Sequence, residues 1–181
     1  MADQRNELAV GATAPAFALP DTDGNTHTLG DPIGVAATAV IWTCNHCPYA
    51  LAWHERLLDA ARDYGPREVR FLAINSNDAV SHPGDSLQAM QERVASEDWP
   101  HPYLHDESQQ VARAWGAKTT PHVFVLDRDH VVRYAGAPDA DYNDPGLRAV
   151  WLREALDDVL EGREVRRAET DPIGCGVKWK K

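Results

Sequence analysis

One stretch of this 181-residue chain constrains the fold more than any other. An apolar, β-branched run, IGVAATAVIW at 33–42, leads directly into WTCNHCPYA at 42–50. A continuous apolar run of this length is typical of a central strand that is buried on both faces. Pro48 indicates the first turn of a helix, because a proline there gives up no intrahelical hydrogen bond. The sequence therefore predicts a buried strand that ends at Thr43 and a helix over 45–64, with two cysteines at their junction.

The rest of the chain alternates between strand and helix patterns. The segment 17–29 predicts a β-hairpin, and 69–77 predicts a second buried strand. Helices are expected over 85–94, 108–116 and 144–162, the first of them starting at Asp85 or Ser86. A hairpin of 122–127 and 131–136 lies between the last two helices, 98–104 is too rich in proline for regular structure, and 163–181 reads as a tail. This order predicts an α/β sheet with helices on both faces, whose functional residues lie at the carboxyl ends of its strands.

Composition narrows the range of partners. Hydrophobic residues make up 43 % of the chain, which suits one folded domain with a core. The formal net charge is −10, so a phosphate backbone would be repelled and we expect no nucleic-acid partner. No apolar run is long enough to cross a bilayer, and the first ten residues lack the pattern of a secretory signal. We therefore expect no membrane association and a cytoplasmic location.

The three cysteines are Cys44, Cys47 and Cys175. An odd number in a chain of this size argues against a disulfide scaffold. Thiols at the start of a helix meet unpaired backbone N–H groups and the positive end of the helix dipole, both of which favour the thiolate. His46, between the first two cysteines, would lower a thiol pKa further when protonated. The two-residue spacing allows a reversible disulfide, so the main interpretation is a redox pair of Cys44 and Cys47.

Two other interpretations of the pair stay open. The first is that both cysteines are inert thiols in the core. The second is a zinc site, which needs four ligands; His46, His54 or Cys175 would have to complete the set. The chain has no second CxxC and no pair of histidines at ligand spacing, so we expect no metal and no other cofactor. His54 is otherwise expected to be a solvated helix residue.

A second motif supports the redox interpretation. KTTPHVFVLD places Pro121 just before a predicted strand, where proline is tolerated. If the Thr120–Pro121 bond is cis, the backbone of Thr120 can turn toward the cysteines and pair with an extended substrate; an ordinary trans turn is the alternative. Trp42 either shields the pair from water or ends the core of its strand. The candidate substrate-binding residues are Trp42, Thr43, His46, Pro48, Thr120 and Pro121.

Taken in order, these motifs resemble a known family. The residues that carry the resemblance are GATAPAFALPDTDG (11–24), WTCNHCPYA (42–50), LAINSND (72–78), PYLHDESQQVARAWGAKTTPHVFVLD (102–127) and DPIGCGVKWK (171–180). The chain resembles the thioredoxin-like superfamily and, more narrowly, the bacterial peroxiredoxin-like redoxins related to alkyl hydroperoxide reductase and thiol-specific antioxidant. The resemblance implies a thioredoxin fold, with a central mixed sheet, an N-terminal β-hairpin extension and an insertion before the second half. It implies a domain over 8–162, a tail over 163–181 that carries Cys175, and a cis Pro121.

The resemblance also implies an enzyme, a thiol–disulfide oxidoreductase that uses Cys44 and Cys47. True peroxiredoxins carry P-x-x-x-T-x-x-C and a later arginine. If Cys47 matches their peroxidatic cysteine, Cys44 stands at the threonine, Val40 at the proline, and Pro121 near the arginine. A peroxide needs polarising donors to react fast. A thiol peroxidase, with Cys47 peroxidatic and Cys44 or Cys175 resolving, is therefore the alternative, and a zinc-binding or redox-sensing module is the second alternative.

The expected reaction leaves the roles of the thiols open. In thioredoxins the first cysteine attacks, which would be Cys44; in peroxiredoxins the matching position is Cys47, which its neighbours His46 and Pro48 favour mildly. Cys175 is either a mobile third thiol that resolves an intermediate or a packed tail residue. The expected partners are a disulfide-containing protein or a small-molecule disulfide or hydroperoxide, and a thiol reductant such as a thioredoxin or glutathione system.

Overall fold

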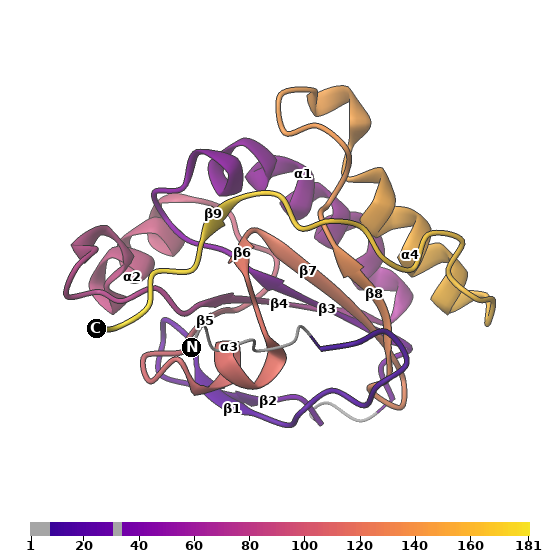
Figure 1. Cartoon of the computed structure of the whole chain (residues 1–181), viewed down its shortest axis with the longest axis horizontal. Coiled ribbons are helices and arrows are strands. Elements are labelled where there is room, and N and C mark those ends of the chain that lie inside the picture. The colour runs from indigo at the N-terminus through magenta and orange to yellow at the C-terminus, as the bar shows by residue number, and fades with distance from the viewer. Residues whose placement is uncertain (1–7, 31–33) are drawn as a thin grey trace.

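The computed structural model describes residues 8–30 and 34–181, and its centre is a mixed sheet of five strands (Figure 1). The strand order is β5-β4-β3-β7-β8, with bounds Tyr103–His105, Val69–Asn75, Ala37–Trp42, His122–Asp127 and Val132–Gly136. β3 pairs in parallel with β4 and antiparallel with β7. Every residue of β3 is buried, which explains why its sequence shows no polar alternation. The mixed central sheet expected for a thioredoxin fold is confirmed.

Strand pairing brings the two sequence motifs together. In the antiparallel register of β3 and β7, Trp42 lies opposite His122. The carboxyl end of β3, which leads into Cys44, therefore lies beside the start of β7, which follows Pro121. Residues almost eighty positions apart in the sequence meet at this end of the sheet.

Helices cover both faces of the sheet, as expected. The helices are α1 (Pro48–Tyr64), α2 (Leu87–Ser96), α3 (Gln110–Trp115) and α4 (Val150–Leu160), with 3₁₀ turns η1 (Gly65–Arg67), η2 (Pro83–Asp85) and η3 (Pro145–Leu147). Ala39 and Ile41 of β3 pack with α1 and α4 on one face. Val40 and Trp42 pack on the other face with α3 and with the hairpin of β1 (Ala18–Pro20) and β2 (Thr26–Thr28). Figure 1 shows α1 and α4 above the sheet, and α3 and the hairpin below it.

Most predicted elements are present, with shifted ends. The first strand begins at Ala37 rather than at residue 33, which lies outside the described residues. The first helix begins at Pro48, and α2 follows Ser86, whose side chain accepts a hydrogen bond from the backbone of Ala89. The predicted helix over 144–162 is divided into η3 and the shorter α4.

The prediction that 98–104 has no regular structure is wrong at its end. Tyr103 and Leu104 belong to β5 and pair in parallel with Ala73 and Ile74 of β4. β5 is an edge strand, and prolines just before an edge strand remove no ladder hydrogen bond from the sheet. α2 and β5 form the insertion between β4 and the second half of the fold.

A buried ion pair ties α1 to the loop before α4. Arg56 Nη1 lies 2.9 Å from Asp139 Oδ2, and the two side chains are 6 % and 0 % exposed. The carboxylate of Asp139 also accepts hydrogen bonds from Trp53 Nε1 at 2.8 Å and from the backbone of Ala149 at 2.9 Å. Burying these charges is tolerable because each carboxylate oxygen is paired. The pair holds the helix that carries the cysteines at its start.

The C-terminal segment is not a loose tail. After α4 it runs back along the same face toward the start of β7, as the yellow trace in Figure 1 shows. There β9 (Cys175–Gly176) pairs antiparallel with β6 (Thr119–Thr120), the short strand just before Pro121. Among the described residues, none of the helices has the length and apolar character needed to span a membrane.

Candidate active site

The two cysteines of the motif flank the turn between β3 and α1. Cys47 is the N-cap residue of α1, with extended backbone angles of φ −69° and ψ 124°, and Pro48 occupies the first turn. The Cys47 carbonyl accepts the hydrogen bond of Leu51 N at 2.9 Å, which begins the helical ladder. The predicted position of Cys47 at a helix N-terminus is therefore confirmed. Unpaired N–H groups of the first helical turn stabilise negative charge there.

Both sulfur atoms face Thr120. Cys44 Sγ lies 3.3 Å from Thr120 Oγ1, and Cys47 Sγ lies 3.2 Å from the Thr120 carbonyl oxygen, to which it donates only while it is a thiol. The bond between Thr120 and Pro121 is cis, as the resemblance implies. The β3–β7 register thus builds one site from two distant motifs.

The environment separates the acidities of the two thiols. A hydrogen bond from Cys44 lowers the pKa of Cys47 to about 4, and the Cys175 side chain and the backbone N–H of Ala50 act in the same direction against burial. The Cys44 pKa is raised well above its ordinary value, because this thiol is the donor to Cys47 and because it is buried. The charge of Asp85 adds to that rise. Cys47 is therefore the more acidic thiol of the pair and Cys44 the less acidic one.

The site is closed to solvent. Cys44 and Cys47 are both 0 % exposed. They pack with Ala50, Tyr49 and Cys175. The cover comes from the C-terminal segment, because β9 lies on β6 directly beside the sulfurs. Sequence patterns carry no sign of this cover, since the two strands are only two residues long each.

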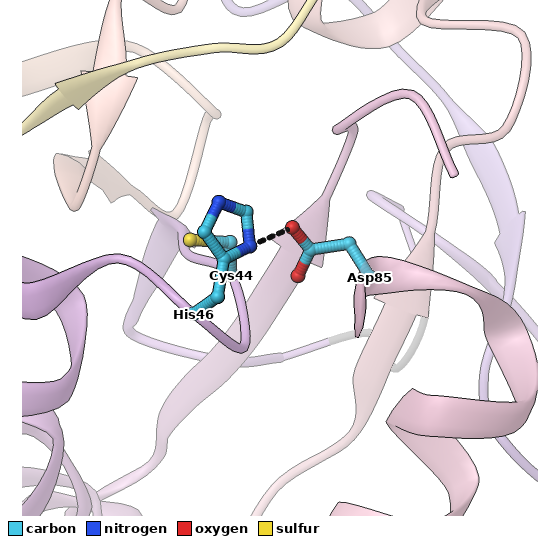
Figure 2. A group of neighbouring side chains, drawn as sticks. All are labelled: Cys44, His46 and Asp85. Carbon is cyan, nitrogen blue, oxygen red and sulfur yellow. Dashed lines mark ion pairs between the residues drawn. The ribbon is translucent and has the colours of Figure 1, made fainter. Parts of the chain in front are cut away.

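His46 is held by a buried carboxylate. Its Nδ1 lies 2.5 Å from Asp85 Oδ2, and the Asp85 side chain is 0 % exposed whereas that of His46 is 39 % exposed. Figure 2 shows the imidazole ring aimed at the Asp85 carboxylate, with the Cys44 sulfur on the other side of the ring. The Asp85 carboxylate also accepts hydrogen bonds from three N–H groups: Asn45 N at 2.7 Å, Asn75 Nδ2 at 3.1 Å and Asn77 Nδ2 at 3.0 Å. His46 also stacks on His82, with ring centroids 5.3 Å apart.

Arg93 fixes the loop between the two cysteines. Its guanidinium donates to the Cys44 carbonyl at 3.0 Å and to Asn45 Oδ1 at 3.1 Å. Sequence reasoning missed both Arg93 and Asp85 as site residues. Asp85 was considered only as a helix start, and no spacing rule connects residue 85 or 93 to a motif at 44–47. Only the packing of η2 and α2 beside the loop brings them there.

A metal ion would find one suitable group of donors in the described part of the chain. Cys44, His46 and Asp85 each offer one ligand atom, and these three atoms lie within 4.8 Å of one another. A structural zinc site needs a fourth protein ligand. Of the other ligands considered from sequence, Cys175 is not in this group, and His54 pairs with Glu97 at 2.6 Å. His54 is also buried, so the expectation that it is solvated is wrong.

The remaining candidate residues divide into interior and rim. Trp42 is 0 % exposed, packs on Trp115 and Phe124, and donates from Nε1 to Ser76 Oγ at 3.0 Å. Thr43 is also buried, and its backbone N–H is bonded to Ile74. Both therefore lie in the position of core residues rather than at a substrate surface. Pro48 and His46 are exposed, while Thr120 and Pro121 are buried beneath the C-terminal segment.

Comparison with known proteins supports this geometry. A family model described as Redoxin matches residues 9–150. A solved structure of an uncharacterized conserved protein from Geobacillus kaustophilus is 41 % identical, with a TM-score of 0.91 over 97 % of this chain and 94 % of that one. The thiol-disulfide oxidoreductase ResA of Geobacillus thermodenitrificans is 28 % identical over 132 residues, 72 % of this chain and 70 % of its own length.

A more distant structure shows the fold alone. It is a putative thiol:disulfide interchange protein DsbE from Chlorobium tepidum, 20 % identical, with a TM-score of 0.69 over 85 % of this chain and 99 % of that chain. Its similarity agrees with the mixed sheet and the strand order described above.

Proposed function

The chain belongs to the redoxin family, and from that premise we propose that it catalyses thiol–disulfide exchange through Cys44 and Cys47. The observation that carries the proposal is the hydrogen-bonded pair itself. Cys47 lies at the start of α1, both sulfurs contact Thr120, and the Cys44 side chain lowers the pKa of Cys47. The relative named ResA is a thiol-disulfide oxidoreductase, which agrees with this activity.

The reaction proceeds in two exchanges of sulfur bonds. The Cys47 thiolate attacks one sulfur of a substrate disulfide, the substrate S–S bond breaks, and the departing thiolate takes up a proton. Cys44 then loses its proton and attacks the Cys47 sulfur of the mixed disulfide, which releases the second substrate thiol. Two electrons pass from the pair to the substrate. A thiol reductant, such as a thioredoxin or glutathione system, returns the Cys44–Cys47 disulfide to two thiols.

The charge distribution suits Cys47 as the attacking group. At neutral pH a thiol with a pKa near 4 is almost entirely thiolate, whereas Cys44 keeps its proton until the mixed disulfide forms. Asp85, whose charge raises the Cys44 pKa, pairs with His46 in the turn between the two cysteines. The rim residues His46 and Pro48 are the surfaces that a disulfide-containing protein or small molecule would meet first, because Thr120 is covered by the C-terminal segment.

Insulin reduction with dithiothreitol tests the proposal. We expect the wild-type chain to accelerate precipitation of the insulin B chain, and we expect Cys44→Ser and Cys47→Ser each to abolish the acceleration. Ser108→Ala, an exposed position away from the site, serves as the matched control and should keep the full rate. Full activity in Cys47→Ser would exclude Cys47 as the nucleophile.

A thiol peroxidase is the second candidate function. Cys47 is the peroxidatic candidate because its pKa is lowered, with Cys44 or Cys175 resolving. The Thr120 hydroxyl lies 3.3 Å from Cys44 Sγ and also helps to lower the Cys47 pKa, so either function could use this donor. Mass spectrometry after one equivalent of hydrogen peroxide separates the two functions: a peroxidase forms sulfenic acid or disulfide within seconds, whereas an exchange enzyme oxidises slowly. Metal analysis of freshly purified protein tests the zinc-binding alternative at Cys44, His46 and Asp85.

A further inference from the structure

The C-terminal segment occupies the edge of the site in an extended conformation. We call residues 174–178 the strap. In the strap, Cys175 lies opposite Thr120 and Gly176 opposite Thr119 in an antiparallel register. Val177 N continues the ladder by donating to the Lys118 carbonyl at 3.1 Å. An extended segment that adds a strand to an exposed edge is a general mode of peptide recognition. The strap is bound to its own chain in this mode.

The strap is anchored at both of its ends. Lys178 N donates to Asn77 Oδ1 at 2.8 Å, and the Lys178 carbonyl accepts from Asp78 N and from Gln109 Nε2, each at 2.8 Å. At the other end Gly174 lies directly on the backbone of Thr120. A Cβ built on Gly174 would lie 2.2 Å from the Thr120 carbonyl oxygen, so only glycine permits this approach.

The strap delivers a third sulfur to the pair. Cys175 packs against Cys44, Cys47 and Ala50, and its side chain helps to lower the pKa of Cys47. Burial, together with the neighbouring Cys47 thiolate, raises the pKa of Cys175 to about 11. All three cysteines are free thiols in this structure. Cys47 thus has a potential disulfide partner on either side.

We propose that Cys175 is a third redox thiol and that the strap is a tethered substrate, so that one disulfide moves between Cys44–Cys47 and Cys47–Cys175. This movement of the disulfide, which we call the relay, rests on the exchange activity proposed above. In the oxidised pair, Cys175 loses its proton and its thiolate attacks the Cys47 sulfur. The Cys44–Cys47 bond breaks, the Cys47–Cys175 bond forms, and Cys44 leaves as a thiolate that takes up the proton. One S–S bond is exchanged for another, so the step needs no outside oxidant or reductant.

The surroundings of Cys44 favour this direction of proton movement. The Cys44 side chain is fully buried, and Asp85 places a negative charge near it. Once the Cys44–Cys47 bond has broken, the Cys44 thiolate is a strong base and takes up the proton that Cys175 lost. In the product, the strap is covalently fixed over the site. An external disulfide reaches Cys47 only when the strap is displaced, so the strap also excludes substrates that cannot compete for β6.

Peptide mapping of the oxidised protein tests the relay. Trypsin leaves Cys44 and Cys47 together in the peptide 6–56 and Cys175 in the peptide 168–178. After treatment with one equivalent of oxidised glutathione and an acid quench, the wild type should show both the internally bridged peptide 6–56 and a cross-link between the two peptides. Cys44→Ser should show only the cross-link, and Cys47→Ser should show neither species. Absence of the cross-link in both the wild type and Cys44→Ser would overturn the relay.

A matched pair of glycine variants tests the strap without removing a thiol. In Gly174→Ala the added Cβ would lie 2.2 Å from the Thr120 carbonyl oxygen, which is a clash. In Gly176→Ala the added Cβ would lie 4.0 Å from the Lys118 carbonyl oxygen, which is an ordinary contact. A clash of this kind shifts the equilibrium between the bound and the displaced strap by about tenfold or more. We therefore expect N-ethylmaleimide to alkylate Cys47 about tenfold faster in Gly174→Ala than in Gly176→Ala. Equal rates in two variants with equal urea midpoints would show that the strap does not cover Cys47.

The two proposals fail in different ways. If the internally bridged peptide 6–56 does not form and insulin is not reduced, the exchange function itself is wrong. If that peptide forms and insulin is reduced, but no cross-link to 168–178 appears, the exchange function stands and Cys175 is a packed residue only.

Discussion

The pKa of Cys47 can be tested by removing its principal hydrogen-bond donor. The Cys44 thiol is the largest cause of the lowered Cys47 pKa of about 4, and Cys44→Ala deletes this donor while leaving Cys175 and the N–H of Ala50 in place. A hydrogen bond to a charged group is worth about 1.5–3 kcal/mol. One pKa unit corresponds to about 1.4 kcal/mol, so the Cys47 midpoint should rise by about 1–2 units.

The assay is absorbance at 240 nm, which reports thiolate and needs no reagent to enter the closed site. In the reduced wild type we expect one thiolate signal to persist from pH 8 down to a midpoint near pH 4. In Cys44→Ala the midpoint should lie about 1–2 units higher. Cys47→Ser should lack this transition. A wild-type signal that appears only above about pH 8, like that of a free thiol, would refute the reasoning.

The same titration predicts how stability depends on pH. The pKa of Cys47 is lower in the folded chain than the value of about 8.5 for a free thiol in the unfolded chain. Its contribution to the free energy of unfolding is therefore fully present above about pH 8.5 and declines as the pH falls toward the folded pKa. The difference in urea stability between wild type and Cys47→Ser should shrink over that range. A difference that grows on acidification would contradict the assignment of Cys47 as the thiolate.

Three further predictions concern the surroundings of the pair. Asp85→Asn removes the carboxylate that pairs with His46 and with three N–H groups, so the free energy of unfolding in urea should fall by about 1–3 kcal/mol. Because the charge of Asp85 raises the Cys44 pKa, this pKa should also fall in the variant, as measured by thiolate absorbance. Arg56→Met leaves Asp139 as an unpaired buried charge and should cost about 3–5 kcal/mol, whereas Arg62→Met, on the exposed pair with Asp59, should cost less than about 1 kcal/mol. A stabilised Cys47 thiolate favours the reduced form of the pair. Titration against glutathione should therefore give a Cys44–Cys47 reduction potential above about −270 mV, the value typical of thioredoxin. A lower reduction potential would count against the stabilised thiolate.

Local sequence signals were sufficient to predict that Cys44 and Cys47 lie at the junction of a strand and a helix. The apolar run before Thr43 and the proline at 48 specify a buried strand and a helix start, and these signals act within a few residues of each other. The hairpin over 122–136 and the end of α3 at Gly116 were predicted for the same reason. Family resemblance, rather than pattern, indicated the cis bond at Pro121.

Other features depended on contacts between distant segments. Asp85 and Arg93 reach the CxxC loop only because η2 and α2 pack beside it, and Tyr103 joins the sheet only because β4 offers it an unpaired edge. No periodicity encodes such contacts, since each depends on where a separate element lies in space.

By itself, the sequence determined where the three cysteines stand and that two of them lie between a buried strand and a helix, because strand and helix signals are local. Tertiary structure alone makes Cys47 more acidic than Cys44, because the lowered Cys47 pKa depends on groups of Cys44, Cys175 and Ala50 placed around it. It also decided that the pair is closed. The strap covers the site through backbone hydrogen bonds to β6, and backbone groups are the same in every sequence, so their pairing leaves no pattern of side chains to read.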